Sequence, residues 1–152
     1  MLYYLELYDF NPEQLKNIET ATASLESNLG YLSLDVRGLK SSNQFRMLYR
    51  DDYHGSSVWP FEQYFIYLAA IKFQLSRIQK VTLNCYNYWI NSINDQLHNS
   101  VSGSILIFPE YFRPLFNSDH TDYFNCKWIA KGCWTQLWSL VTAYAWLRET
   151  KS

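Results

Sequence analysis

The chain has 152 residues, a formal net charge of -1 and 48% hydrophobic residues, which suits one globular domain, residues 1–152, that folds without a metal ion or a disulfide. A charge so close to zero argues against a nucleic-acid partner, because phosphate binding needs a clustered excess of lysine and arginine. The three cysteines include no CxxC pair, and the first residues lack the basic stretch and cleavage pattern of a secretion signal, so we expect a cytoplasmic protein.

The first third of the chain predicts a small β-meander with one helix. Residues 1–10 are Leu-rich and aromatic, as in a strand, and they stop at Asn11, which can cap a helix that begins with proline. Apolar residues then recur at helical spacing until Gly30, where we expect the helix to end. Two stretches of alternating polarity, 32–37 and 45–50, predict a β-hairpin. Together with the first strand, the hairpin gives a three-stranded antiparallel sheet.

One apolar stripe at helical spacing runs without glycine or proline from Phe61 to His98. A single helix of that length would span about 57 Å, whereas a compact domain of this size is about 40 Å across. We therefore expect the helix either to break near residues 79–84 or to project. Its polar positions are mostly Asn and Gln, which suits a protein interface because amides form hydrogen bonds without the desolvation cost of charge. An AT-rich coding sequence explains the same excess without an interface.

The last third predicts helix with one ambiguous segment. Residues 105–108 are apolar and fit a buried strand or the lead into a helix, and Pro109 and Pro114 frame a short helical turn. Residues from about 120 to 149 predict helix, which Gly132 can divide in two. The expected fold class is therefore α+β and mainly helical, with a small N-terminal antiparallel β-meander and one helix, followed by a bundle of long helices.

The segment from Gly132 to Leu147 contains three tryptophans and no charge. This run is shorter than the roughly 20 residues of a membrane-spanning helix, so we expect no membrane span. On a helix, one half is apolar and the other is weakly polar. The apolar half comprises Trp134, Leu137, Trp138, Leu140, Val141, Tyr144, Ala145 and Leu147. The weakly polar half contains Ser139, Thr142 and Trp146, and we expect another helix or a partner to cover it.

Each histidine of the chain lies near an aspartate, which is the one arrangement that suggests chemistry. Asp95 precedes His98 by three residues, a spacing that metal ligands use on helices. A metal-dependent hydrolase or other small enzyme that uses His54, Asp95, His98 and His120 is therefore an alternative. These pairs of Asp and His also lie near the expected ends of helices and strands, where Asp and His are common because they cap helices. We expect no metal or other cofactor, and we favour a non-enzyme over an enzyme.

Aromatic residues make up 18% of the chain, more than a core can hold at its centre, and Tyr and Trp often anchor interfaces. We therefore expect a small protein-protein interaction module. A stoichiometric inhibitor of the immunity-protein or antitoxin type, which covers a partner's active site, is one form. The expected partner is another protein, and a homodimer is also compatible. The expected binding residues are Trp59, Tyr64, Tyr67, Tyr88, Trp146, Asp51, Asp52, Asp119 and Asp122. The second alternative is a binder of a small aromatic or lipid-like ligand.

Overall fold

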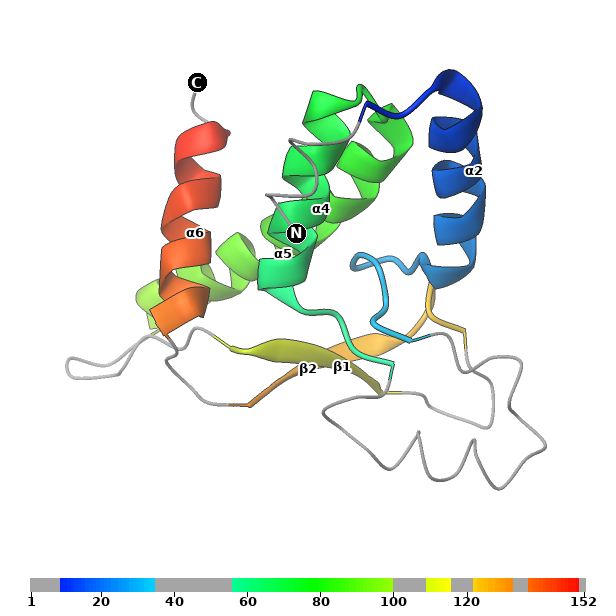
Figure 1. Ribbon diagram of the computed structural model, residues 1–152. Helices are drawn as coiled ribbons and strands as arrows, with labels where there is room; N and C mark the ends of the chain where they lie inside the picture. The colour runs from blue at the N-terminus through cyan, green and yellow to red at the C-terminus, as the bar shows by residue number, and fades with distance from the viewer. Residues whose placement is uncertain (1–8, 35–55, 100–108, 116–121, 133–136, 151–152) are drawn as a thin grey trace.

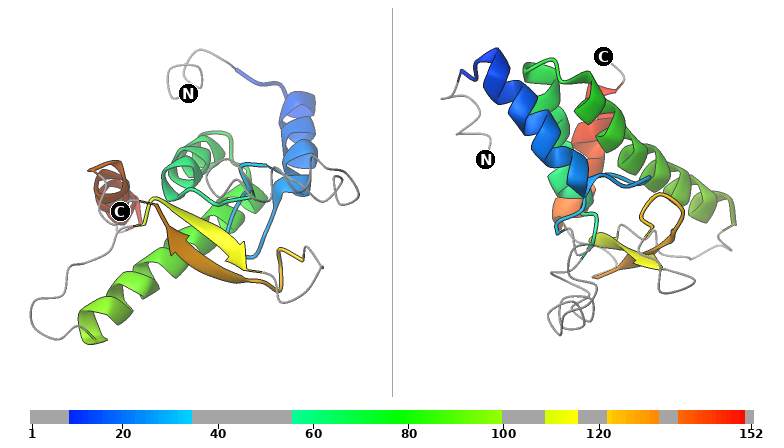
Figure 2. Two further views of the ribbon diagram at one scale, coloured as in Figure 1. Left: turned by 90° about the horizontal axis from the view of Figure 1, so that it is seen from below. Right: turned by 90° about the vertical axis from the view of Figure 1, so that its right-hand side faces the viewer.

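The computed structural model describes residues 9–34, 56–99, 109–115, 122–132 and 137–150. Its helices gather on one side of a small two-stranded sheet, which lies below them in Figure 1. Seen from below, the sheet lies across α5 (Figure 2). In chain order the elements are α2 (Pro12–Thr22), the 3-10 turn η1 (Ala23–Leu25), α4 (Pro60–Lys72), α5 (Ser76–Asn99), β1 (Tyr111–Leu115), β2 (Lys127–Lys131) and α6 (Leu137–Glu149).

The expected N-terminal β-meander is wrong. Within the described residues α2, α4 and α5 come before the sheet, which β1 and β2 form in the C-terminal half, and α6 follows it. Residues 1–8 and 45–50 of the expected strands lie outside the described part, while residues 32–34 lie inside it and form no strand. The backbone of Tyr31 pairs instead with a helix side chain: its N–H donates to Oε1 of Gln63 at 2.8 Å and its carbonyl accepts from Nε2 at 2.9 Å. On its other side Tyr31 forms a single antiparallel bridge with Glu26, so the stretch is paired without forming a strand.

The sheet occupies positions where helix was expected. β1 takes the place of the helical turn between Pro109 and Pro114, and β2 lies within the stretch 120–149. The strands are antiparallel, and on its other side β1 is paired with Val58, whose N–H donates to the carbonyl of Phe112 at 2.9 Å. This pairing joins residues far apart in the chain, so local periodicity does not reveal it.

Gly132 ends β2 and does not divide a helix. Its φ is +86°, a conformation that favours glycine. A Cβ atom at this position would also lie 2.5 Å from Oε2 of Glu110. Backbone conformation and close packing therefore both require glycine here.

α2 begins as predicted. The Asn11 side chain accepts the Gln14 N–H at 2.9 Å, and the Gln14 side chain accepts the Asn11 N–H at 2.9 Å, which is a reciprocal capping box. The helix ends at Thr22, earlier than expected, because the chain turns through η1 into an extended residue, Glu26. Gly30 has a different role. A Cβ atom there would lie 2.7 Å from Oε1 of Gln63, so glycine allows that side chain to reach the backbone.

The long apolar stripe breaks between α4 and α5, at residues 73–75, and α5 continues unbroken through residues 79–84. Gln74 has a φ of +57°. The Leu75 N–H donates to the Ala70 carbonyl at 2.9 Å, and the Gln74 N–H donates to the Ile71 carbonyl at 3.1 Å. These two bonds define a Schellman turn, which usually has glycine at the left-handed position. Because this position holds glutamine and not glycine, the sequence pattern did not predict the turn.

Replacing Gln74 with glycine is expected to raise the free energy of unfolding by about 1 kcal/mol, because glycine adopts a positive φ without steric cost. The Gln74 side chain is exposed, so little packing is lost. Urea denaturation followed by circular dichroism measures the change. The matched control is Lys80→Gly, at an exposed position inside α5, which is expected to lower the same quantity by about 1 kcal/mol. A loss of stability in Q74G would contradict the left-handed turn.

Two groups of apolar side chains form the core. The larger lies between the helices and the sheet and includes Cys85 and Trp89 of α5, Phe112 of β1 and Trp128 of β2. The smaller lies under α2, around Tyr31, Ala70 and Ile78. α5 contributes side chains to both groups, so it contacts the sheet through the larger one and packs on α4, which in turn contacts α6.

Candidate functional site

The weakly polar half of α6 faces the interior of the protein. Ser139, Thr142, Ala143 and Trp146 are all buried, and Trp146 is 0% exposed. The Ser139 hydroxyl donates to the carbonyl of Pro109 at 3.3 Å, which satisfies a polar group that burial removes from water. The small side chains let α6 approach the rest of the protein closely. Other helices of the chain therefore cover this half.

The opposite side of α6 carries large apolar side chains in contact with solvent. Leu140 is 44% exposed, Val141 is 55% exposed and Tyr144 is 64% exposed. Spacings of one, three and four residues place them on one face of the helix. We name these three residues the α6 outer face. The apolar half of an amphipathic helix normally faces a core, so this orientation leaves apolar surface for which the described residues supply no cover.

Trp146 lies among three tyrosines that hold α6 against α4 and α5. The ring centroids of Tyr64 and Tyr67 are each 5.7 Å from that of Trp146, and the centroid of Tyr86 is 5.1 Å away. The Tyr86 and Thr150 hydroxyls lie 3.1 Å apart and form a hydrogen bond beside this cluster. Three of the expected binding residues, Tyr64, Tyr67 and Trp146, thus lie together, but in a packing contact between helices.

An open groove of about 580 Å³ lies between α5 and β2. Asn84, Asn87 and Tyr88 of α5 line one side, and Tyr88 is 41% exposed. The Tyr88 hydroxyl donates to the carbonyl of Trp128 at 3.2 Å, and the Trp128 indole N–H donates to Oδ1 of Asn28 at 2.6 Å. The amide-rich part of α5 that the sequence singled out therefore lines a groove with one charged residue, Lys127, among its described lining residues. Of the expected binding residues that the structure describes, Tyr88 is the one that borders it.

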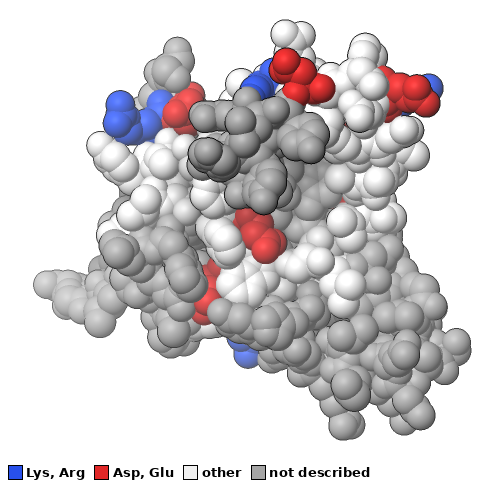
Figure 3. All heavy atoms as spheres, in the orientation of Figure 1, with Lys and Arg blue, Asp and Glu red and all other residues white. Residues whose placement is uncertain are grey.

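Charged side chains are unevenly distributed on the face of the molecule in Figure 3. Most of the red and blue atoms of the described residues lie along the upper edge, where α2 begins and where α4 and α6 end (Figures 1 and 3). Below that edge, acidic atoms are also visible near the centre and at the lower left, and basic atoms at the bottom, among uncharged atoms of the described residues (Figure 3).

Trp59 and Asp122, two further expected binding residues, have local structural roles. The Trp59 ring stacks on Tyr111 with centroids 5.0 Å apart, and its N–H donates to the Ser57 hydroxyl at 2.9 Å. The exposed carboxylate of Asp122 accepts the Phe124 N–H at 2.9 Å and an Nδ2 hydrogen of Asn125 at 2.7 Å. These bonds, first the one from Asn125, lower the pKa of Asp122, and they order the turn that precedes β2.

The alternative metal site lies mostly beyond the described side chains. His54, His120, Asp51, Asp52 and Asp119 fall outside the described residues. Asp95 and His98 lie on the last turns of α5, but their side chains are not described. Among the side chains that the structure describes, no group of three or more His, Cys, Asp or Glu is placed to hold a metal ion.

Neither described cysteine has the character of a nucleophile. Cys85 is fully buried, and burial raises the pKa of its thiol. Burial also raises the pKa of Cys126 to about 11. Because the thiolate is the reactive form, both side chains stay protonated and unreactive near neutral pH.

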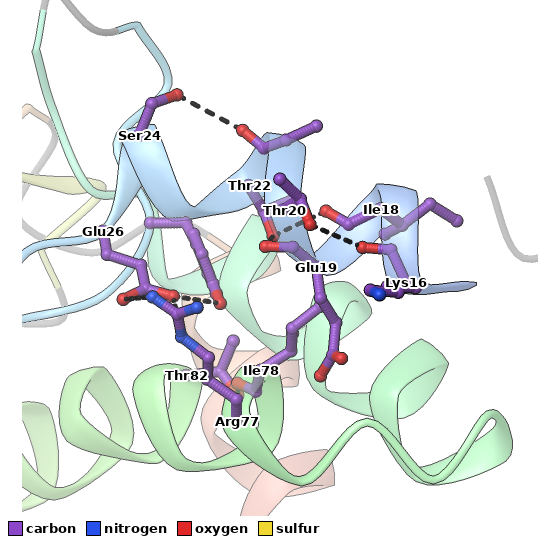
Figure 4. A network of polar contacts seen from close by, with 12 residues as sticks. Lys16, Ile18, Glu19, Thr20, Thr22, Ser24, Glu26, Arg77, Ile78 and Thr82 are labelled. Carbon is purple, nitrogen blue, oxygen red and sulfur yellow. Dashed lines mark hydrogen bonds and ion pairs between the residues drawn. The ribbon is translucent and has the colours of Figure 1, made fainter. Parts of the chain in front are cut away.

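A polar network ties the end of η1 to α5 (Figure 4). Nε and Nη2 of Arg77 each lie 2.9 Å from an oxygen of the buried Glu26 carboxylate, which gives a two-bond pair. The Tyr31 hydroxyl donates to the same carboxylate at 3.3 Å. Burial, and then the charge of Glu26, raise the pKa of Tyr31. The partners are distant in the chain, so no sequence signal predicted this network.

Comparison of the chain with protein families, with curated proteins and with solved structures finds no match. None of the helices in the described part of the chain has both the length and the apolar character that crossing a membrane requires. The function is therefore inferred from the surfaces themselves.

Proposed function

We propose that the protein is an interaction module that binds another protein through the α6 outer face. The observation that carries this proposal is the orientation of α6, which buries Ser139 and Thr142 while Leu140, Val141 and Tyr144 stay exposed. Core contacts of Trp146 account for the buried side of α6, whereas the three exposed apolar side chains take no part in that core. Exposing them costs free energy that contact with a partner would recover.

The geometry favours a partner that presents a groove. A stable symmetric dimer buries about 800 Å² on each subunit, far more than three side chains on one helix offer to a flat surface. A hydrophobic groove can enclose a helix on both sides and reach that area, as in other helix-in-groove complexes.

A stoichiometric inhibitor of the immunity-protein or antitoxin type is a narrower form of this proposal. It requires the partner to be an enzyme whose active site the protein covers. Of the four carboxylates expected to meet a basic active site, Asp122 is described, and its oxygens already accept two hydrogen bonds. The described residues therefore support protein binding through an apolar surface and do not add support for the inhibitor form.

Photo-cross-linking from defined positions tests the proposal. A photoreactive phenylalanine analogue replaces Val141 on the α6 outer face, Asn87 in the groove, or Lys16 on the exposed side of α2 as a control. We expect one specific adduct with another protein from position 141 alone. With the identified partner purified, Val141→Glu is expected to weaken binding at least about thirtyfold, because a charge is placed in an apolar contact.

The controls separate loss of binding from loss of folding. Val141 is 55% exposed, so V141E should change the free energy of unfolding by less than about 0.5 kcal/mol. Lys16→Glu changes an exposed charge on another helix and should leave the affinity unchanged. An adduct from position 87 alone would show that the groove, and not the α6 outer face, binds the partner. A cross-linked dimer of this chain would show that the partner is a second copy. Equal affinity of V141E and the native protein would refute the proposal.

A further inference from the structure

A second cavity, separate from the α6 outer face, lies between α2 and α4. It has a volume of about 300 Å³, and its walls are mainly apolar, with Phe10 and Ile18 on the α2 side and Ile66 and Phe73 on the α4 side. The Phe10 and Phe73 rings meet edge to face with centroids 5.2 Å apart. Such a volume is in the range of small-molecule sites.

The polar groups that line this cavity are satisfied, with one exception. Both ends of the Gln63 amide bond the backbone of Tyr31, and the Thr22 hydroxyl donates to the Ile18 carbonyl at 2.9 Å. The Tyr31 hydroxyl donates to Glu26. A ligand would therefore find few unused hydrogen-bonding groups, and most of its contacts would be apolar.

The exception is Glu62, the one charged residue among the described lining residues. Its side chain is half-buried, and burial raises its pKa. It accepts a hydrogen bond from the Ser33 hydroxyl at a long 3.4 Å. The nearby carboxylate of Glu26, by contrast, has a two-bond partner in Arg77. Glu26 is therefore paired with the guanidinium of Arg77, whereas no Lys or Arg among the described residues pairs with Glu62.

We propose that the cavity between α2 and α4 binds a small amphipathic amine, with its ring or chain among the apolar walls and its protonated nitrogen against the Glu62 carboxylate. A dry apolar cavity of about 150 Å³ holds a benzene molecule, so about 300 Å³ suits roughly a dozen non-hydrogen atoms. The ammonium would pair with this carboxylate in a charge-assisted contact.

The charge of the lining excludes other classes of ligand. A fatty acid or aryl carboxylate would place a second negative charge beside Glu62, and the described lining has no Lys or Arg to compensate it. A wholly apolar molecule would lack the charge-assisted contact with Glu62. A partner helix, at about 10 Å in diameter, is too wide for a cavity of this volume.

Calorimetric titration with 4-phenylbutylamine tests the proposal, with 4-phenylbutan-1-ol as the neutral probe of equal size. The amine is expected to bind the full-length protein at least about tenfold more tightly than the alcohol, as a charge-assisted contact would give. Methyl NMR locates the site, because the signals of Ile18, Ile66 and Ile78 in the cavity should shift while that of Ile129 on β2 should not.

Two variants separate the charge from the cavity. Glu62→Gln keeps the shape and should remove the preference for the amine, whereas Glu13→Gln, at an exposed acid in the first turn of α2, should not. Ala69→Leu fills the cavity and should abolish binding of both probes, with the thermal midpoint maintained or raised. Equal affinity of amine and alcohol for the native protein, unchanged methyl signals up to about 5 mM amine, or undiminished binding by A69L would each overturn the proposal.

Discussion

Replacing Trp146 with alanine is expected to lower the free energy of unfolding by about 3–5 kcal/mol, the usual cost of removing a fully buried tryptophan. Trp146 is 0% exposed and is among the largest fully buried side chains described. It is also the α6 side chain that contacts Tyr64, Tyr67 and Tyr86 on the neighbouring helices. Without it, α6 would lose its main anchor. Urea denaturation should then show a lower midpoint, and circular dichroism a loss of helix before the main transition.

Two variants on the same helix and at the same site make this prediction specific. Tyr144→Ala removes a side chain that is 64% exposed, so it should change the free energy of unfolding by less than about 0.5 kcal/mol. Trp146→Phe should cost less than W146A, because the buried indole N–H has no hydrogen-bond partner in the described part of the protein and phenylalanine removes that unsatisfied group. Equal losses in W146A and Y144A would contradict the assigned orientation of α6.

The start of α2 could be predicted because its signals are local. Asn11, Pro12 and Gln14 lie within one turn, and their hydrogen bonds form between neighbouring residues. The break between α4 and α5 has local hydrogen bonds as well, but its left-handed residue is Gln74, a type that carries no turn signal. Helix contacts in the smaller core, where Leu75 packs, stabilise the turn against that local preference.

The orientation of α6 and the position of the sheet depend on distant contacts. Counting residues on a helical wheel gives Leu140, Val141 and Tyr144 more weight than Trp146, but the three tyrosines that surround Trp146 come from other helices. β1 likewise depends on pairing with β2 and Val58. Contacts with distant residues determine which side of a helix is buried, because periodicity shows that a helix has two different faces without showing which one packs against the core.

The candidate surfaces could be predicted only in part. The excess of amides on α5 pointed to Asn84 and Asn87, which line the groove. Residue type alone also selected Trp59 and Trp146, but these aromatic rings are buried and pack within the protein. No sequence signal marked the cavity, since its apolar walls and Glu62 come from segments that meet only after folding.

Replacing Gln63 with leucine is expected to lower the free energy of unfolding by about 2–6 kcal/mol, because two backbone groups of Tyr31 would then be buried without a partner at about 1–3 kcal/mol each. The native amide is 0% exposed and bonds both the Tyr31 N–H and its carbonyl. Gln79→Leu is the matched comparison. It removes a single hydrogen bond, from Nε2 to the Ala70 carbonyl at 2.9 Å, and should cost about 1 kcal/mol. A loss in Q63L no larger than that in Q79L would contradict this role.

The Gln63→Glu variant tests the same contact through its pH dependence. A protonated carboxyl can accept from the Tyr31 N–H and donate to the Tyr31 carbonyl, as the amide does, whereas the ionised form cannot donate. Burial disfavours the ionised form, so the introduced carboxyl should have a higher pKa in the folded protein than in the unfolded chain. Its stabilising effect is then fully present below the unfolded pKa and is lost as pH rises through the folded pKa. Relative to the native protein at each pH, Q63E should therefore be destabilised more at pH 7 than at about pH 4. A penalty that does not change with pH would show that the side chain at position 63 does not pair with the backbone of Tyr31.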